Sequence, residues 1–208
     1  MPGVQHMRHT HLPEHKFVKG QPETGVELAE DLERIAMNFG GENIAACIVE
    51  PIAGSTGTLV PPKGYLKRLR EICDKHGILL IFDEVITGWG RTGSAFAAQE
   101  WGVTPDIMTM AKATTNGVVP MGVVAVKEEM YDTVLDASKN PEGTPELFHG
   151  YTYSGIPVAV AAALAVQDIF DKEDIFNRAK EMSPYFQDGL HSLKDLKEVV
   201  SIRGYGMM

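Results

Sequence analysis

The feature that most constrains the fold is a short apolar run that ends on two carboxylates. Residues 78–82 read ILLIF, and Asp83 and Glu84 follow at once, before the chain becomes rich in glycine. An apolar run of this length, bounded by turn-forming residues, is typical of a strand buried in a sheet. The sequence therefore predicts that acidic side chains stand where a buried strand leaves the core.

Further apolar runs alternate with segments of helical periodicity. We expect strands at 44–49, 78–82, 106–110, 122–126 and 199–203, and helices at 26–39, 65–76, 157–170 and from there to about 193. Strands that alternate with helices are typical of a mainly parallel sheet covered on both faces. The predicted fold class is therefore α/β, a three-layer α/β/α sandwich with a mainly parallel central sheet.

Three chemically active side chains follow predicted strands. Glu50, Asp83 and Lys112 each lie at or just beyond the carboxyl end of a strand. Since parallel strands present their carboxyl ends at one edge of the sheet, ligands bind at that edge in folds of this class. The sequence therefore predicts that these three residues gather around one site.

The composition narrows the classes of partner. The chain of 208 residues is 44% apolar and 23% charged, and its net charge of −9 argues against a nucleic-acid or anionic-membrane surface. No stretch approaches the ~18 apolar residues of a membrane helix, and no basic-then-apolar leader begins the chain. Cys47 and Cys73 lie in apolar runs and are expected to be reduced core residues. We therefore expect a cytoplasmic protein that binds neither nucleic acid nor membrane.

The first 25 residues lack periodicity and contain histidines at positions 6, 9, 11 and 15. A metal site is one interpretation of this tract. The spacing is irregular, however, and no cysteine or carboxylate motif accompanies it. We therefore expect a solvated loop and no metal.

Two classes of enzyme end a buried strand on acidic residues. ATPases use them to hold Mg²⁺, and pyridoxal phosphate enzymes use an aspartate that faces the ring nitrogen of the cofactor. An ATPase also needs the phosphate-binding segment G-x-x-x-x-G-K-[ST] before the carboxylates. This chain offers only GWGRTGS at 88–94, which follows the carboxylates and lacks the lysine. The second class needs a lysine near a strand end, and the pair of Lys112 and Asp83 favours it.

Four sequence blocks carry a more specific signal. They read VEPIAGSTG, ILLIFDEVITGWGRTG, GVTPDIMTMAKATTNGVVPMG and YTYSGIPVAVAAA. In this order they resemble a class III aminotransferase of fold type I, with the nearest likeness to the omega-amino acid (β-alanine)–pyruvate transaminases. Each block alone is weak, but the four together are highly specific, and the likeness extends from about residue 9 to the end.

The chain departs from the family pattern at three positions. Trp89 stands where the family usually has Phe, Ala113 where Gly usually follows the lysine, and Ile156 where His is common. None of these changes removes a chemical group that the reaction needs. The β-carbon of Ala113 restricts the local backbone dihedrals and is expected to shift the Lys112 backbone slightly.

The resemblance implies pyridoxal 5′-phosphate as cofactor and gives roles to three residues. Lys112 matches the lysine that forms a Schiff base with the cofactor and moves a proton during transamination. Asp83 matches the aspartate that faces the pyridine nitrogen and favours its protonated form. Val85 matches the residue that packs on one face of the ring. Without the resemblance, Asp83 would be a helix cap or a structural ion pair, and Val85 a core residue.

Three further residues keep two interpretations each. Thr152 matches a threonine that reaches the cofactor phosphate of the neighbouring subunit, which implies a homodimer or homotetramer; a turn residue is the alternative. Glu50 matches a glutamate near the substrate side of the ring, and a structural strand-end carboxylate is the alternative. Arg91 could bind an anion or form a buried structural pair.

The resemblance also implies a reaction and a domain layout. The reaction moves an amino group from an omega-amino acid or amine to pyruvate or a similar keto acid, so these small molecules are the expected partners. A complete family member is longer, so residues 1–195 would be part of the large cofactor-binding domain, truncated at both ends, and 196–208 the start of the small C-terminal domain. The alternatives are a same-fold aminomutase or decarboxylase, and a catalytically incompetent fragment that only dimerises. As a fragment, this chain on its own is expected to bind the cofactor weakly or not at all and to be weakly active or inactive.

Overall fold

The computed structural model describes residues 3–137 and 150–208. At the centre of this described part is a four-stranded sheet in the order β1-β2-β3-β4. The strands are β1 (Ala46–Val49), β2 (Leu79–Asp83), β3 (Ile107–Met110) and β4 (Val123–Val126). The first three are parallel, and β4 pairs antiparallel with β3. The predicted α/β class with a mainly parallel sheet is therefore confirmed.

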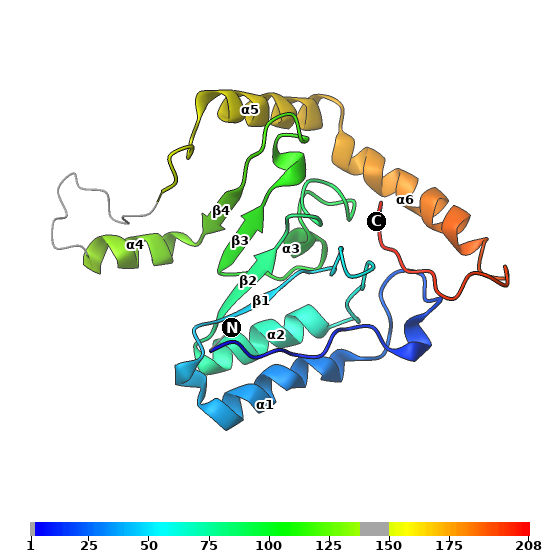
Figure 1. The fold of residues 1–208 in the computed structure, drawn as a ribbon, viewed down its shortest axis with the longest axis horizontal. Helices are drawn as coiled ribbons and strands as arrows, with labels where there is room; N and C mark the ends of the chain where they lie inside the picture. Colours follow the sequence, from blue (N-terminus) through cyan, green and yellow to red (C-terminus); the bar gives the residue numbers. More distant parts are fainter. Residues whose placement is uncertain (1–2, 138–149) are drawn as a thin grey trace.

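A layer of helices covers one side of the sheet (Figure 1), and the hydrophobic core lies on that side. The helix α1 (Glu30–Phe39) follows the 3-10 turn η2 (Val26–Ala29), and α2 (Tyr65–His76) packs against β2. The short helix α3 (Ala97–Glu100) extends this layer. Apolar positions that recur every three to four residues turn one face of α1 and of α2 toward the sheet. The core includes Leu32, Leu69, Ile72, Leu80, Phe82 and the free, buried thiols of Cys47 and Cys73, which were predicted as core residues.

The opposite side of the sheet is covered more thinly. The helices α5 (Pro157–Lys172) and α6 (Ile175–His191) lie away from α1 and α2 in Figure 1. Helix α5 contacts the turn at Lys112–Thr114 just beyond β3, and α4 (Glu128–Ala137) follows β4. Ile48 on β1 and Val124 on β4 are 62% and 64% exposed. Within α5, Ala159 is the buried residue of the helix. The sheet therefore has one well-packed face and one face with apolar side chains open to solvent.

The N-terminal segment is less solvated than its sequence predicts. His15, at the end of the turn η1 (Pro13–His15), is 4% exposed, so the solvated-loop prediction is wrong there. Its Nδ1 accepts a hydrogen bond from the Leu12 amide (3.2 Å), and its Nε2 lies 3.3 Å from the Thr24 hydroxyl. Within residues 3–137 and 150–208, no group of three or more histidine, cysteine or acidic side chains is arranged to hold a metal ion. In the same residues, none of the helices has the length and apolar character to span a bilayer.

Residues 199–203 do not form the predicted strand. The Ile202 amide donates to the Lys16 carbonyl (2.7 Å), and the Ser201 hydroxyl donates to the same oxygen (2.9 Å). Arg203 donates through Nε to the Gly57 carbonyl (2.6 Å). The segment is thus held by scattered bonds to loops, without a neighbouring strand to extend a ladder. The domain boundary after residue 195 stays a prediction.

Candidate active site

The sheet brings three predicted site residues to one edge. Val49 pairs with Phe82 and Asp83 pairs with Thr109 in the parallel register. Glu50 therefore follows β1, Asp83 ends β2, and Lys112 comes two residues after the end of β3. All three strands run in the same direction, so the shared strand-end placement predicted from the sequence is present.

Lys112 occupies a strained backbone conformation at this edge. It begins the 3-10 turn η4 (Lys112–Thr114), and its φ of 45° lies in the left-handed region. Non-glycine residues rarely adopt that region, and such strain concentrates at functional sites. The Gly117 amide donates to the Lys112 carbonyl (3.1 Å), which closes the turn. The Lys112 side chain is exposed, so its amine is open to a ligand.

The two adjacent carboxylates have different surroundings. Asp83 is half-buried, and its Oδ1 accepts a hydrogen bond from the Val85 amide (3.0 Å). Its Oδ2 has no hydrogen-bond partner among residues 3–137 and 150–208, so it can accept a bond from a ligand. The Val85 bond also fixes the carboxylate relative to the segment that follows β2.

Glu84 is a structural carboxylate. Its side chain is fully buried and accepts bonds from the Ala97 amide (2.8 Å), the Ala98 amide (2.8 Å) and the Thr87 hydroxyl (2.9 Å). These amides belong to the first turn of α3, so Glu84 satisfies donors that the helix leaves unpaired. Burial raises the pKa of Glu84, while the same three donors act in the opposite direction.

A cavity of about 340 Å³ opens beside Lys112. Val85, the predicted ring-packing residue, lines it together with the lysine. Arg91 also lines it; the residue is exposed, and its guanidinium has no ion pair in the described part of the chain, so the alternative of a buried structural pair is wrong. The lining residues are Gly54, Ser55, Thr58, Val85, Ile86, Arg91, Lys112, Ala113, Met207 and Met208.

Glu50 and Thr152 are less directly placed. The Glu50 Oε2 accepts a hydrogen bond from the amide of Gly54, a residue that lines the cavity (2.9 Å). This bond also fits the alternative interpretation of Glu50 as a structural carboxylate at a strand end. Thr152 is exposed and lies in a turn. The turn is closed by a hydrogen bond from the Ser154 amide to the Tyr151 carbonyl (2.9 Å). Thr152 does not line the cavity, so within this chain the structure does not bring it to Lys112.

Sequence reasoning assigned no role to Trp89, although it recognised the residue as a departure from the family pattern. Its φ is 62°, and its indole Nε1 donates to the Thr114 hydroxyl (3.0 Å), in the turn that begins with Lys112. No periodicity in the sequence reveals such a dihedral. The unusual tryptophan beside the glycines was the one signal in the sequence.

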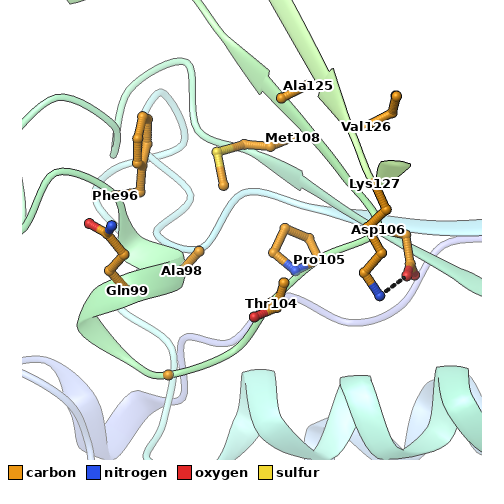
Figure 2. Close-up of a pocket in the computed structure, with 11 residues that line it drawn as sticks. Phe96, Ala98, Gln99, Thr104, Pro105, Asp106, Met108, Ala125, Val126 and Lys127 are labelled. Carbon is orange, nitrogen blue, oxygen red and sulfur yellow. Dashed lines mark ion pairs between the residues drawn. The ribbon is translucent and has the colours of Figure 1, made fainter. Parts of the chain in front are cut away.

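A larger cavity of about 450 Å³ lies at the opposite end of β3 (Figure 2). Phe96, Met108 and Ala125 line it, and Lys127 Nζ forms an ion pair with Asp106 Oδ1 (2.7 Å) at its margin. The charged groups there neutralise each other, and none of the predicted site residues lines this cavity. The cavity beside Lys112 is therefore the candidate active site.

Comparison with known sequences gives a consistent family. Residues 1–208 match the family described as "Aminotransferase class-III". The chain is 56% identical, over 207 residues and 99% of its length, to the omega-aminotransferase of Caulobacter vibrioides. It is 51% identical, over 98% of its length, to the beta-alanine–pyruvate aminotransferase of Pseudomonas aeruginosa. It spans 46% of the length of each of these two relatives.

Solved structures show the same likeness. The omega transaminase from Pseudomonas jessenii in complex with PMP superimposes with a TM-score of 0.89 at 35% identity, over 99% of this chain and 45% of that one. An (S)-enantioselective omega-transaminase from Thermomicrobium roseum gives a TM-score of 0.80 at 43% identity, over 86% of this chain and 39% of that one.

Proposed function

The chain belongs to the class-III aminotransferase family, and we propose that it provides the cofactor lysine of a transaminase dependent on pyridoxal 5′-phosphate. The reaction would move an amino group from an omega-amino acid or amine to pyruvate or a similar keto acid. The observation that carries this proposal is that Lys112, which lines the cavity, and Asp83, which does not line it, lie at the same edge of a parallel sheet. The names of the similar proteins support the substrate class.

The residues present fit this cofactor. An exposed lysine amine lines the cavity, an aspartate with a free oxygen lies at the same strand edge, and the apolar Val85 lines the wall. When bound, pyridoxal phosphate supplies an aldehyde that reacts with amines and a ring that draws electrons from the reacting carbon. Lys112, Asp83 and Val85 would hold it.

Lys112 would act twice. Its Nζ would bind the cofactor covalently until the amino donor displaces it. The released, neutral amine would then take a proton from the carbon that bears the donor's amino group and give it to the cofactor carbon that carried the aldehyde. In the second half of the reaction it would move a proton in the opposite direction, onto the keto carbon of the acceptor. The left-handed conformation of Lys112 suits this task, because it orients the side chain from a short, hydrogen-bonded turn.

Asp83 would hold the proton of the ring nitrogen. Its Oδ2 would accept a hydrogen bond from that nitrogen, and a carboxylate in this position favours the protonated ring. The bond from the Val85 amide to Oδ1 keeps the carboxylate oriented. Glu50, held by the Gly54 amide, would face the substrate side.

We also propose a homodimer or homotetramer in which Thr152 donates a hydrogen bond to the cofactor phosphate of the neighbouring subunit. Two observations support it: the Thr152 side chain is exposed away from its own cavity, and α5 shows apolar side chains to solvent. The acidic net charge and the free, buried thiols of Cys47 and Cys73 support a cytoplasmic location. Residues 1–195 and 196–208 would be parts of a large and a small domain.

A trapping experiment tests the proposal. Pyridoxal phosphate is added to the protein, borohydride reduces the product, and peptide mass spectrometry locates the label; amine-to-alanine conversion with pyruvate is measured in parallel. We expect a visible absorbance band, label on Lys112, and loss of both in Lys112→Ala. Lys63→Ala, an exposed lysine paired with Glu23, is the matched control and should behave as wild type.

Other results would point elsewhere. Label on Lys112 without alanine formation would indicate an aminomutase or a decarboxylase. A stable dimer without label in the full gene product would indicate a protein that only associates, and would refute the proposed chemistry. Because the chain spans less than half of its relatives, the 208-residue chain is measured both alone, where we expect weak labelling and little activity, and within any longer product of its reading frame.

A further inference from the structure

We infer that Trp89 and Thr114 position Lys112 for its reaction with the cofactor, an inference that rests on the proposed function. The Trp89 indole Nε1 donates to the Thr114 hydroxyl oxygen (3.0 Å), and the Thr114 hydroxyl donates in turn to the Ala111 carbonyl (3.0 Å). The chain of bonds ends on the peptide that joins Ala111 to Lys112. It therefore links a side chain of the glycine-rich segment to the backbone of the lysine.

The peptide before Lys112 determines where the lysine points. The φ of Lys112, 45°, is the rotation between that peptide and the side chain, and a non-glycine residue keeps such a value only if its surroundings hold it. The Ala111 carbonyl accepts two bonds from Thr114, one from the hydroxyl and one from the amide (3.0 Å). Rotation of the peptide toward a relaxed φ would break both bonds.

The indole is itself held in place. Phe96 meets it edge to face, with ring centroids 4.9 Å apart, and Phe170 of α5 stacks on it at 5.9 Å. The Trp89 amide donates to the Ala95 carbonyl (2.6 Å), which fixes the backbone from which the ring projects. Its nitrogen is therefore a rigid donor. Thr114 is 3% exposed, so water does not replace this donor when it is removed.

A phenylalanine at position 89 would keep the ring contacts but would lose the donor. The departure from the family pattern at this position thus adds one polar link, and the link reaches the lysine turn. A role limited to packing predicts that ring size matters and the N–H does not. A positioning role predicts that loss of the indole N–H matters even when an aromatic ring is kept. It also predicts that loss of the Thr114 hydroxyl has the same effect and that the two losses do not add.

The variants separate these two roles. Trp89→Phe removes the donor and keeps an aromatic ring, Thr114→Val removes the hydroxyl and keeps the shape, and Thr114→Ser keeps the hydroxyl. Trp101→Phe is the matched control, because the Trp101 indole nitrogen has no hydrogen-bond partner in the described residues. The full gene product, freed of cofactor, is mixed with pyridoxal phosphate, and the rate at which Lys112 acquires borohydride-reducible label is followed by mass spectrometry. Thermal midpoints are recorded in parallel.

We expect Trp89→Phe and Thr114→Val each to slow labelling of Lys112 by about fivefold, the effect of one lost hydrogen bond on a rate. The double variant should be no slower than the slower single variant, because both break the same link. Thr114→Ser and Trp101→Phe should label like wild type. Equal rates in all variants, or a Thr114→Ser as slow as Thr114→Val, would overturn the inference. A wild-type protein that never acquires label would instead refute the proposed function.

Discussion

Asp83 and Glu84 are adjacent in the chain, yet their carboxylates differ in exposure and in hydrogen bonding. Successive residues at the end of a strand point to opposite sides. Asp83 keeps one oxygen without a partner among the described residues, whereas Glu84 is fully buried and accepts three hydrogen bonds. One residue is therefore available to a ligand, and the other is committed to the fold.

This contrast predicts opposite effects of two amide substitutions. Asp83→Asn should weaken retention of pyridoxal phosphate and leave the thermal midpoint close to that of wild type, because the proposed role of this charge is to hold the ring nitrogen and the carboxylate accepts a single hydrogen bond within the described residues. Glu84→Gln should lower the free energy of unfolding by about 2 kcal/mol, because its amide would present hydrogen atoms to buried donors. Cofactor retention after dialysis and urea unfolding measure the two effects. If Asp83→Asn unfolded as easily as Glu84→Gln, Asp83 would be structural.

At the scale of residues, the sequence predicted the placement of side chains that lie at strand ends. It did not predict contacts that depend on unusual backbone dihedrals. Lys112 and Asp83 follow from the apolar runs that precede them. The role of Trp89 does not, because its positive φ leaves no periodic signature. His15 was predicted to be solvated, since its burial depends on bonds to Leu12 and Thr24, which only the folded chain brings to it.

At the scale of elements, Asp106 joins three neighbouring strands at the edge where β2 and β3 begin and the antiparallel β4 ends. Its Oδ2 accepts a bond from the Leu80 amide of β2 (2.7 Å) and from Arg70 of α2 (2.7 Å), and Lys127 binds Oδ1 just after β4. Burial alone would raise the pKa of Asp106, but Lys127, the Leu80 amide and Arg70 together lower it to about 2. The carboxylate is thus a buried cross-link at the amino end of β3.

This cross-link predicts a specific pH dependence. A carboxyl whose pKa falls from 3.8 to about 2 on folding stabilises the protein fully above pH 3.8, and the contribution is lost as the pH falls toward 2. Asp106→Asn should therefore lower the free energy of unfolding by about 2 kcal/mol at neutral pH. The difference from wild type should be smaller at pH 3 in urea unfolding. A loss of equal size at both pH values would show that shape, not charge, matters at Asp106.

The elements themselves were largely predictable, and the exceptions have a physical cause. The strands β1, β3 and β4 lie within predicted apolar runs, β2 extends one residue beyond its run to Asp83, and α2 has the predicted bounds. The run at 199–203, VVSIR, also contains three apolar residues, but a strand needs a neighbouring edge, and these residues meet loops at Lys16 and Gly57 instead. The composition of a short segment does not indicate whether the fold places an unpaired strand edge beside it.

At the scale of the whole molecule, apolar side chains on α5 remain uncovered. Val158, Leu164 and Ile169 are 60%, 63% and 48% exposed. Apolar patches of this kind mark interaction surfaces in soluble proteins. This exposure is the basis for expecting α5 at the interface of the proposed homodimer.

A charge on α5 should separate the subunits. We expect Leu164→Lys to move the protein from dimer toward monomer in sedimentation velocity, because a buried lysine in the interface would be desolvated without a partner. Met37→Lys, on α1 and equally open to solvent at 72% exposed, is the control and should leave the assembly unchanged. A dimer that survives Leu164→Lys with unaltered circular dichroism would place the interface elsewhere.

The position of Trp89 also allows the site to be followed by tryptophan fluorescence. The chain contains two tryptophans, so a Trp101→Phe protein has a single indole emitter, and that emitter is bonded to the lysine turn. A chromophore joined to Lys112 would lie within range of resonance energy transfer from this ring. The fluorescence of one native residue would then report occupancy of the site in real time, without any attached dye.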